Sequence, residues 1–222
     1  MPRVLITGAG RGIGIEFARQ YAAAGWEVIS TVRDLAQAEA LQALGARVEA
    51  LDMRDFAEVE AFPERLGGAP LDLFIANAGI TAAPTVGTAA EAGAWSEVHA
   101  VNAVAPTLLA TRLLPNVVAA HGKMIAISSR MGSIADSSGG YLGYRASKAA
   151  LNAAWRTLAL DWRAQPVTLA VLHPGWVKTD MGGPNAPLPA QTSVVAMRRL
   201  IERLTPAQSG AFLGHEGEPI PW

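Results

Sequence analysis

Short apolar runs alternate along this chain with longer segments in which apolar residues recur at helical spacing. Apolar runs bounded by glycine or polar clusters are typical of strands buried on both faces of a parallel sheet. Such runs predict seven strands, at 4–6, 26–32, 47–51, 71–76, 123–128, 167–172 and 211–213. The other segments predict helices at 15–24, 34–44, 55–66, 90–114, 144–165 and 192–204. This alternation predicts right-handed crossovers and one doubly wound parallel sheet, so the fold class is α/β.

Composition narrows the class of protein. The 222 residues suit one domain, 1–222; half of them are hydrophobic and 17% are charged, as in a globular chain. The net charge is −1 and the Lys and Arg residues are scattered, which argues against nucleic acid as a partner. The chain has no cysteine, and no apolar stretch reaches about 18 residues. We therefore expect a cytoplasmic protein without a membrane partner.

A glycine-rich loop, Thr7-Gly8-Ala9-Gly10-Arg11-Gly12-Ile13-Gly14, lies between the first predicted strand and the first predicted helix. Glycines allow a tight turn and the close approach of a pyrophosphate, and the free N–H groups at a helix start attract anions. The strand before the loop and the helix after it favour dinucleotide binding over a plain connection. The predicted cofactor-binding residues of this loop are Gly8, Gly10, Arg11, Gly12, Ile13 and Gly14.

The end of the second predicted strand bears on the choice between NAD and NADP. An acidic residue there binds the ribose 2′-hydroxyl of NAD, whereas an arginine accommodates the 2′-phosphate of NADP. This chain has Val32 at the expected acidic position and Arg33 directly after it, and Arg11 is a second cation. Asp34 could bind the ribose, but it more simply caps the next helix. NADP(H) is therefore favoured, and NAD(H) is the alternative.

Tyr144 and Lys148 are four residues apart in an alanine-rich segment that predicts a helix, so their side chains share one face. A free phenol has a pKa of ~10, and a nearby ammonium lowers that pKa because it favours the phenolate. The pair is a candidate proton donor to an alkoxide that forms at a substrate carbonyl. The alternative is a half-buried tyrosine beside a solvated lysine, and the other motifs of the chain favour the donor.

Taken together, the motifs resemble those of the short-chain dehydrogenases/reductases over nearly the whole chain. The matching pieces are, in order, Thr7-Gly8-x-x-x-Gly12-x-Gly14, Asn77-Ala78-Gly79, Asn102, Ser129, Tyr144-x-x-x-Lys148 and Pro174-Gly175. Segments 127–134 and 139–141, with the short C-terminal part, look most like the C-factor-like carbonyl reductases. The resemblance implies a single-domain Rossmann fold, with about seven parallel strands and helices on both faces of the sheet.

The resemblance also implies roles for a catalytic set. Tyr144 is expected to protonate the carbonyl oxygen, while Lys148 lowers the pKa of Tyr144 and holds the nicotinamide ribose. Ser129 is expected to hydrogen-bond the substrate oxygen. Ser128 competes for this assignment, but the two-residue gap between Ser129 and Gly132 matches the family motif.

Asn102 belongs to the same set, and its place in the sequence has a physical reason. Pro106, four residues later, has no N–H, so the Asn102 carbonyl lacks its helical partner. That carbonyl could hold a water that leads to Lys148 and relays protons from solvent to Tyr144. A simple helix kink at this point is the alternative, and both can hold together.

Further cofactor contacts follow from the resemblance alone. Residues after the third and fourth strands are expected at the adenine and its ribose, and residues after the sixth strand are expected to fix the carboxamide and orient one nicotinamide face. These residues are Asp52, Met53, Asn77, Ala78, Gly79, Pro174, Gly175, Val177 and Thr179, and the cofactor set also includes Tyr144 and Lys148.

An apolar substrate pocket is expected beside the nicotinamide turn. The Gly- and Pro-rich segment 182–187 is predicted to be a mobile flap over it, or else an inert loop. The four histidines have no metal-ligand spacing, so no metal site is predicted. The predicted pocket walls are Met131, Tyr141, Trp176 and Met181, and the alternative for Tyr141 is packing within its own loop.

We expect an NADP(H)-dependent oxidoreductase that reduces an aldehyde, ketone or quinone, with Tyr144 as the general acid. Two alternatives stay open: an NAD-dependent alcohol dehydrogenase of the same family, and a dinucleotide-binding protein that signals or senses redox state. The expected partners are a small carbonyl or alcohol substrate and further copies of the chain. Members of the family often pair the helices that carry Asn102 and Tyr144, so we expect a homodimer or homotetramer.

Overall fold

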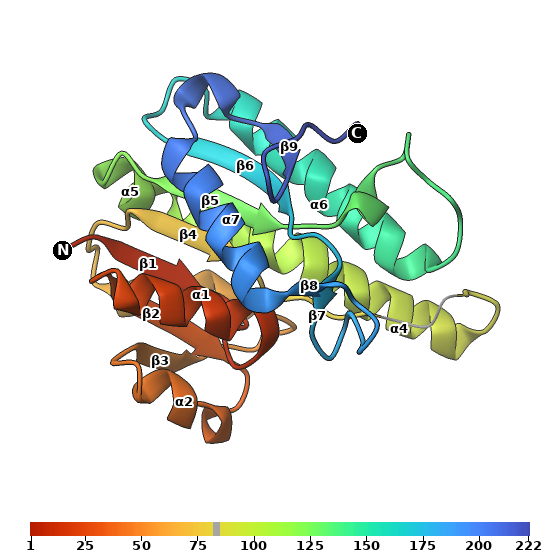
Figure 1. The fold of residues 1–222 in the computed structure, drawn as a ribbon, viewed down its shortest axis with the longest axis horizontal. Coiled ribbons are helices and arrows are strands. Elements are labelled where there is room, and N and C mark those ends of the chain that lie inside the picture. The colour runs from red at the N-terminus through yellow and green to blue at the C-terminus, as the bar shows by residue number, and fades with distance from the viewer. Residues whose placement is uncertain (82–84) are drawn as a thin grey trace.

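A computed structural model describes residues 1–81 and 85–222. Its centre is a seven-stranded parallel sheet with the order β3-β2-β1-β4-β5-β6-β9 (Figure 1). The strands are β1 Arg3–Ile6, β2 Glu27–Val32, β3 Arg47–Ala50, β4 Leu73–Ala76, β5 Lys123–Ile127, β6 Thr168–His173 and β9 Ala211–Gly214. A small separate sheet, which the sequence did not predict, pairs β7 Val177–Lys178 with β8 Leu188–Pro189. The predicted α/β sheet of seven strands is confirmed.

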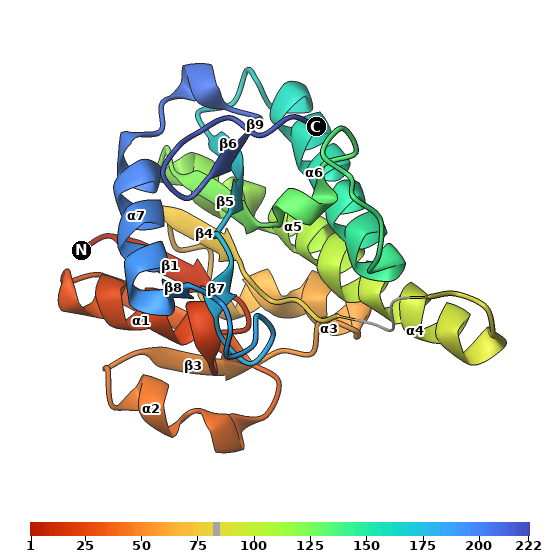
Figure 2. The same cartoon turned by 45° about the vertical axis from the view of Figure 1, so that its right-hand side comes forward.

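Helices cover both faces of this sheet, as predicted. Helices α1 and α7 lie on one face, and α5 and α6 lie on the other (Figures 1 and 2). The α-helices are α1 Gly12–Ala23, α2 Glu39–Gln42, α3 Phe56–Ala61, α4 Ala89–His99, α5 Ala105–Ala119, α6 Leu142–Asp161 and α7 Ala190–Arg203. Short 3₁₀ turns occupy Leu35–Gln37, Phe62–Leu66, Arg130–Gly132 and Pro206–Gln208. None of the helices in the described part of the chain combines the length and apolar character that a membrane span needs.

The strands read as unbroken apolar runs because both of their faces are buried. In β1, Leu5 belongs to the hydrophobic core that includes Trp155 of α6, whereas its neighbours Val4 and Ile6 belong to the core that includes Phe17 of α1. Successive side chains of a strand point to opposite faces, so each layer of helices receives alternate residues of the same strand. The two cores therefore pack the sheet against a layer of helices on each face.

The order of the strands reverses between β1 and β4. Leu5 of β1 lies opposite Ile29 of β2 on one side and opposite Phe74 of β4 on the other. From β1 the chain builds outward to β3 and then returns to place β4 on the other flank of β1. In a doubly wound sheet, ligands bind outside the carboxyl ends of the strands at this reversal. The fold thus marks the loops after β1 and β4 as the place to look for a site.

The prediction of one continuous helix at 34–44 is wrong. A 3₁₀ turn and the one-turn helix α2 replace it, because Asp34 accepts the N–H of Ala36 at 2.9 Å and starts a tight turn at once. Within this stretch Ala38 and Leu41 are buried, Leu44 is half-buried and the other residues are exposed. Two buried residues do not make the continuous apolar stripe that holds a longer helix on a sheet.

The helix predicted at 90–114 is interrupted and extends further than expected. A π-helical turn over Ala100–Val104 separates α4 from α5, and α5 continues to Ala119. Pro106 lies directly after this turn, at the start of α5, where its missing N–H is tolerated. The predicted kink near Pro106 is therefore present in the form of a π turn.

Two other helices differ at their ends. The helix predicted at 55–66 tightens into a 3₁₀ turn from Phe62, next to Pro63, and the last helix of the chain starts two residues before its predicted start. The helix predicted at 144–165 runs over Leu142–Asp161, so it starts earlier and stops sooner than expected. These shifts leave the predicted order of elements intact.

Trp155 should anchor the core beneath α6. Its side chain is buried and its ring lies 6.3 Å from the ring of Phe74, centroid to centroid. Trp155→Ala should lower the free energy of unfolding by about 3–5 kcal/mol, because it removes a large buried side chain and leaves a cavity. Urea unfolding measures this loss. Thr157→Ala, at an exposed position of the same helix, is the control; an equally small effect at both positions would contradict the packing described here.

Candidate active site

The predicted site residues gather at the carboxyl edge of the sheet, as the reversal in strand order requires. Gly8 follows β1, Asn77 follows β4, Ser129 follows β5 and Pro174 follows β6. These strands are neighbours in the sheet, and their loops therefore meet along one edge. Tyr144 and Lys148, from the first turns of α6, complete the group.

The glycine loop is locked against the end of β4. The Thr7 hydroxyl accepts the N–H groups of Asn77 (3.1 Å) and Ala78 (3.2 Å), and the Asn77 amide donates to the carbonyls of Thr7 and Gly8. Gly8 has φ +64°, and an added Cβ would lie 2.8 Å from Cα of Ala78. A Cβ at Gly14 would clash with the Gly8 carbonyl. Glycine is therefore required at Gly8 for close packing against Ala78, and at Gly14 for close packing against the loop itself.

Helix α1 presents a free N-terminus to this loop. Its first residue is Gly12, its N-cap Arg11 has an extended backbone and provides no side-chain cap, and its first turn holds no acidic residue. Uncapped N–H groups and the positive end of the helix dipole favour an anion at this point. The loop and the helix start therefore form a surface suited to a phosphate group.

The two arginines predicted to bind the 2′-phosphate differ in their ionic contacts. Arg33 is exposed at the end of β2 and takes part in none of the salt bridges of the described residues. Arg11 donates to the Asp180 carboxylate at 2.8 Å, and both side chains are exposed. Asp34 caps the following turn, as predicted. Gln37, which the sequence did not single out, places its side-chain oxygen 3.1 Å from where a Cβ of Gly10 would be.

Lys148 is a buried cation on the same face of α6 as Tyr144. Its Nζ donates to the carbonyl of Ile127 at 2.9 Å, its exposed fraction is 4%, and burial lowers its pKa from 10.5 to about 8. The ammonium lies 5.7 Å from the centroid of the Tyr144 ring. The alternative of a solvated lysine is therefore wrong.

The pKa of Tyr144 departs from the expectation. Burial raises it from 10.0 to about 12, and a side-chain hydrogen bond with Ser129 lowers it by less. The predicted net lowering of this pKa is wrong, because desolvation of the phenolate outweighs the effect of Ser129. Tyr144 consequently keeps its proton at neutral pH, which is the state a proton donor needs.

The two adjacent serines have different surroundings. Ser129 hydrogen-bonds with Tyr144, and its hydroxyl accepts the N–H of Met131 at 3.1 Å. The Ser128 hydroxyl instead donates to the side-chain oxygen of Asn152 at 2.6 Å, inside the protein. Ser129, and not Ser128, thus lies beside Tyr144.

Asn102 ties three parts of the site together from the π turn. Its amide nitrogen donates to the Ile80 carbonyl (2.8 Å) and to the Ser147 hydroxyl (3.0 Å), and its amide oxygen accepts the Ile80 N–H (2.8 Å). Ser147 in turn donates to the carbonyl of Tyr144 at 2.8 Å. A Cβ at Gly79 would lie 3.4 Å from the Asn102 oxygen and 3.6 Å from Nζ of Lys148. The water relay through the Asn102 carbonyl stays a prediction.

The turn after β6 is fastened to the last helix. The Ser193 hydroxyl of α7 donates to the Pro174 carbonyl at 2.6 Å, and Gly175 has φ +85°. Val177 is buried, and the methyl group of Thr179 lies 3.4 Å from where a Cβ of Gly12 would be. The predicted carboxamide turn and the glycine loop therefore lie next to each other.

The predicted flap, 182–187, is tied to the same turn. The Gly182 N–H donates to the Thr179 hydroxyl at 3.1 Å, and the Gly182 carbonyl accepts from the Trp176 indole at 2.8 Å. These bonds and the β7–β8 pair give the segment a defined path.

Asp52 and Met53 occupy the expected place after β3. The Asp52 carboxylate forms a salt bridge with Arg54 at 2.6 Å, which holds the pKa of Asp52 below its usual range, and Met53 is buried. Arg54 also reaches Glu97 of α4 at 3.4 Å. The predicted contact of Asp52 with adenine would therefore use a carboxylate that already has a cationic partner.

Comparison with known proteins settles the family. A family model described as short chain dehydrogenase matches residues 2–187. The chain belongs to the short-chain dehydrogenase/reductase family. It is thus an oxidoreductase of that family, and the resemblance predicted from its motifs is confirmed.

Relatives of this short-chain dehydrogenase include C-signal of Myxococcus xanthus, 38% identical over 166 residues, which cover 74% of this chain and 100% of that protein. The carbonyl reductase Sniffer of D. melanogaster has a similar structure, with a TM-score of 0.92 and 31% identity over 100% of both chains. The NADPH-bound carbonyl reductase from chicken fatty liver has a TM-score of 0.90 and 36% identity, over 100% of this chain and 99% of that one.

Large apolar side chains are exposed near the catalytic group of this short-chain dehydrogenase. Tyr141, Trp176 and Met181 are exposed, whereas Met131 is half-buried in the turn after Ser129. They come from the loops that follow β5, β6 and β7. Among the described residues no cluster of three or more potential metal ligands is present.

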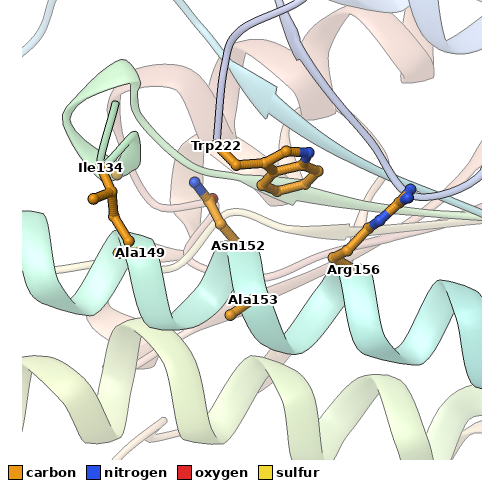
Figure 3. Close-up of a pocket in the computed structure, with 7 residues that line it drawn as sticks. Ile134, Ala149, Asn152, Ala153, Arg156 and Trp222 are labelled. Atoms are coloured by element: carbon orange, nitrogen blue, oxygen red, sulfur yellow. The ribbon is translucent and has the colours of Figure 1, made fainter. Parts of the chain in front are cut away.

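A separate cavity of about 330 Å³ opens beside α6 (Figure 3). Neither Tyr144 nor Lys148 is among the residues that line it. Its lining residues are Gly132, Ile134, Ala149, Asn152, Ala153, Arg156 and Trp222.

Burial of Lys148 should make stability depend on pH. Its pKa falls from 10.5 to about 8 on folding, so between these values the unfolded chain binds a proton that the folded protein lacks. The free energy of unfolding of the wild type should therefore rise relative to that of Lys148→Met as the pH goes from about 8 to about 10. Urea unfolding of both proteins across this range measures the difference, and a constant difference would contradict the lowered pKa.

Proposed function

We propose that this oxidoreductase reduces the carbonyl group of an aldehyde, ketone or quinone with NADPH. The observation that carries the proposal is the position of Tyr144, next to Ser129 and with its ring centroid 5.7 Å from the buried ammonium of Lys148. A carbonyl that becomes an alkoxide needs a proton donor and a hydrogen-bond donor at its oxygen. Tyr144 and Ser129 supply these two groups.

The chain's own residues fit a dinucleotide. The flat glycine loop, in which a Cβ at Gly8 or Gly14 would strike neighbouring backbone, leaves room for a pyrophosphate above the free start of α1. At the other end, the room left by Gly79 next to Nζ of Lys148 suits a ribose that the ammonium can bind. Thr179, beside Gly12, would hold the carboxamide. Bound NADPH would supply the hydride.

NADPH is favoured over NADH by the charges after β2. Val32 occupies the place of the ribose-binding acid and is buried, and Asp34 is engaged as a cap. Arg33 is exposed at the strand end and takes part in none of the salt bridges of the described residues. Arg11 can add a second positive charge when it leaves Asp180. Two cations and no free acid suit a 2′-phosphate.

Proton transfer would then proceed as follows. The Tyr144 phenol gives its proton to the substrate oxygen as negative charge develops there, while Ser129 donates a hydrogen bond to the same oxygen. Lys148, with a pKa of about 8, is largely protonated at neutral pH and stabilises the phenolate that Tyr144 becomes. The structural likeness to two carbonyl reductases, one of them NADPH-bound, supports this direction.

A signalling role is the second candidate, because C-signal is 38% identical to this chain over 166 residues, which are 74% of this chain and the whole of C-signal. A pure sensor would have no need of a complete catalytic set, whereas Asn102, Ser129, Tyr144 and Lys148 are all present and adjacent. NADPH binding without turnover of any aldehyde, ketone or quinone would favour signalling over reduction.

The proposal includes a cytoplasmic setting and a homodimer or homotetramer. Val104, next to α5, and Leu160, on α6, are large apolar residues exposed on the helices expected to pair. Such side chains favour an interface between copies of the chain. Light scattering coupled to gel filtration measures the assembly.

Tyr144→Phe should abolish most turnover. Loss of the proton donor should lower kcat with NADPH and a carbonyl substrate by about 10²–10⁴-fold, while the Kd for NADPH stays within about twofold. Stopped or continuous assays of NADPH consumption, with a fluorescence titration for Kd, measure both. Tyr21→Phe, at the buried tyrosine of α1, is the matched control and should retain turnover. Wild-type kcat in Tyr144→Phe would refute the assignment of the acid.

Arg33→Asp should reverse the preference for cofactor. The Kd for NADPH should rise about 10–100-fold, because a cation that faces the 2′-phosphate is replaced by an anion, while the Kd for NADH changes by less than about threefold. Titration with both cofactors measures the two constants. Arg163→Asp, an exposed arginine just beyond α6, controls for the change in net charge. Equal losses for both cofactors would rule out Arg33 as the phosphate ligand.

A further inference from the structure

The segment that leads into α6 has an unusual backbone. Gly139, Gly140 and Tyr141 have φ of +79°, +70° and +51°, so three consecutive residues lie in the left-handed region. Glycine adopts this region freely, whereas a residue with a Cβ is strained there. Among the described residues His121 is the one other non-glycine with positive φ. Such strain persists where surrounding contacts hold it, and it gathers at functional sites.

Arg145 supplies contacts of this kind. Its Nε donates to the carbonyls of Gly139 (2.9 Å) and Gly140 (3.0 Å), and its Nη2 donates to the Ser138 hydroxyl (2.9 Å). Its Nη1 reaches the Met131 carbonyl at 3.5 Å, in the short turn after β5. A planar guanidinium can hold several acceptors in fixed directions, which the single ammonium of a lysine cannot do. We call this set of bonds the Arg145 clamp.

The Arg145 guanidinium binds oxygens of the loop and forms no ion pair among the described residues. Arg145 takes part in none of the salt bridges of the described residues, so its donors are directed at neutral oxygens. Helix α6 has no side-chain cap at Tyr141. The clamp therefore fastens the start of α6, just before Tyr144, to the loop that carries Ser129 at its other end.

The residue held in the strained conformation presents an aromatic ring to solvent. The exposed fraction of Tyr141 is 57%, although its backbone is fixed by its neighbours. Trp176, in the loop after β6, is also 57% exposed, and its indole is bound to the Gly182 carbonyl at 2.8 Å. Tyr141 directly precedes the first turn of α6, which carries Tyr144, so its exposed ring lies close in the chain to the proton donor. A large exposed ring next to a catalytic group favours a binding surface.

We infer that Arg145 is a positioning residue that holds the Tyr141 ring at the substrate entrance, where it selects carbonyl substrates with an aromatic group. This inference rests on the proposed reductase function. Ring pairs are favourable when their centroids lie about 4.5–7 Å apart, in offset or edge-to-face arrangements. A small aliphatic aldehyde offers nothing to pack on the ring, so the clamp should have no effect on its binding. The clamp should therefore control how strongly the enzyme prefers aromatic over small aliphatic aldehydes.

Steady-state kinetics with 2-naphthaldehyde and propanal test the inference. In Arg145→Met, KM for 2-naphthaldehyde should rise about tenfold, while KM for propanal and kcat for both aldehydes stay within about twofold. Arg145→Lys should behave like Arg145→Met, because an ammonium cannot replace the planar guanidinium that holds several acceptors in fixed directions. Tyr141→Ala should show the same selective rise, and adding Arg145→Met to it should cause no further rise. A lowered kcat, or an equal rise in KM for both aldehydes, would overturn the inference.

Hydrogen exchange provides a readout independent of turnover. The amides of residues 146–148, in the first hydrogen-bonded turn of α6, should exchange at least about tenfold faster in Arg145→Met than in the wild type, while α7 is unchanged. Arg163→Met is the matched control, because its guanidinium donates only to the Leu160 carbonyl among the hydrogen bonds of the described residues. If neither aldehyde is turned over by the wild type, the proposed function and the selection of substrate fail together. Unchanged exchange, in contrast, would overturn the clamp itself.

Discussion

A buried ammonium organises the carboxyl edge of the sheet. Nζ of Lys148 is removed from solvent and donates to the Ile127 carbonyl at 2.9 Å. Burying a cation is unfavourable unless polar atoms surround it, so α6 must lie close to the end of β5 for this bond to form. The same approach places Tyr144, one turn earlier, beside Ser129 at the end of that strand. The position of one charge therefore sets the geometry of the whole catalytic group.

Much of the fold could be predicted because the strands are buried on both faces. β1 and β4 divide their residues between two cores, which leaves an unmistakable apolar run in the sequence. Segment 34–44 has no such constraint. It is mostly exposed, and the side chain of Asp34 decides its conformation locally, so helical composition was a poor guide.

The candidate site was predictable where spacing alone brings residues together, as for Tyr144 and Lys148 on one helix. Its electrostatics were not. The pKa of Tyr144 depends on how far the phenol is desolvated, which the sequence does not express. Bonds between distant segments were equally out of reach: Arg11 with Asp180, and Asn77 with Thr7, pair residues with no local signal. The Arg145 clamp joins α6 to the loop directly before it, yet it depends on three left-handed residues that composition alone does not reveal.

The reversal of strand order has a consequence for how this protein comes to be folded. Leu5 lies opposite Phe74, so the central pairing of the sheet joins segments about 70 residues apart. Closing such a loop is entropically unfavourable before its contacts form, and long-range parallel pairing is slow. The loops after β1 and β4 cannot come together until this pairing is made. A ligand that binds at these loops binds only the chain in which β1 and β4 are already paired. Its binding free energy therefore stabilises this pairing.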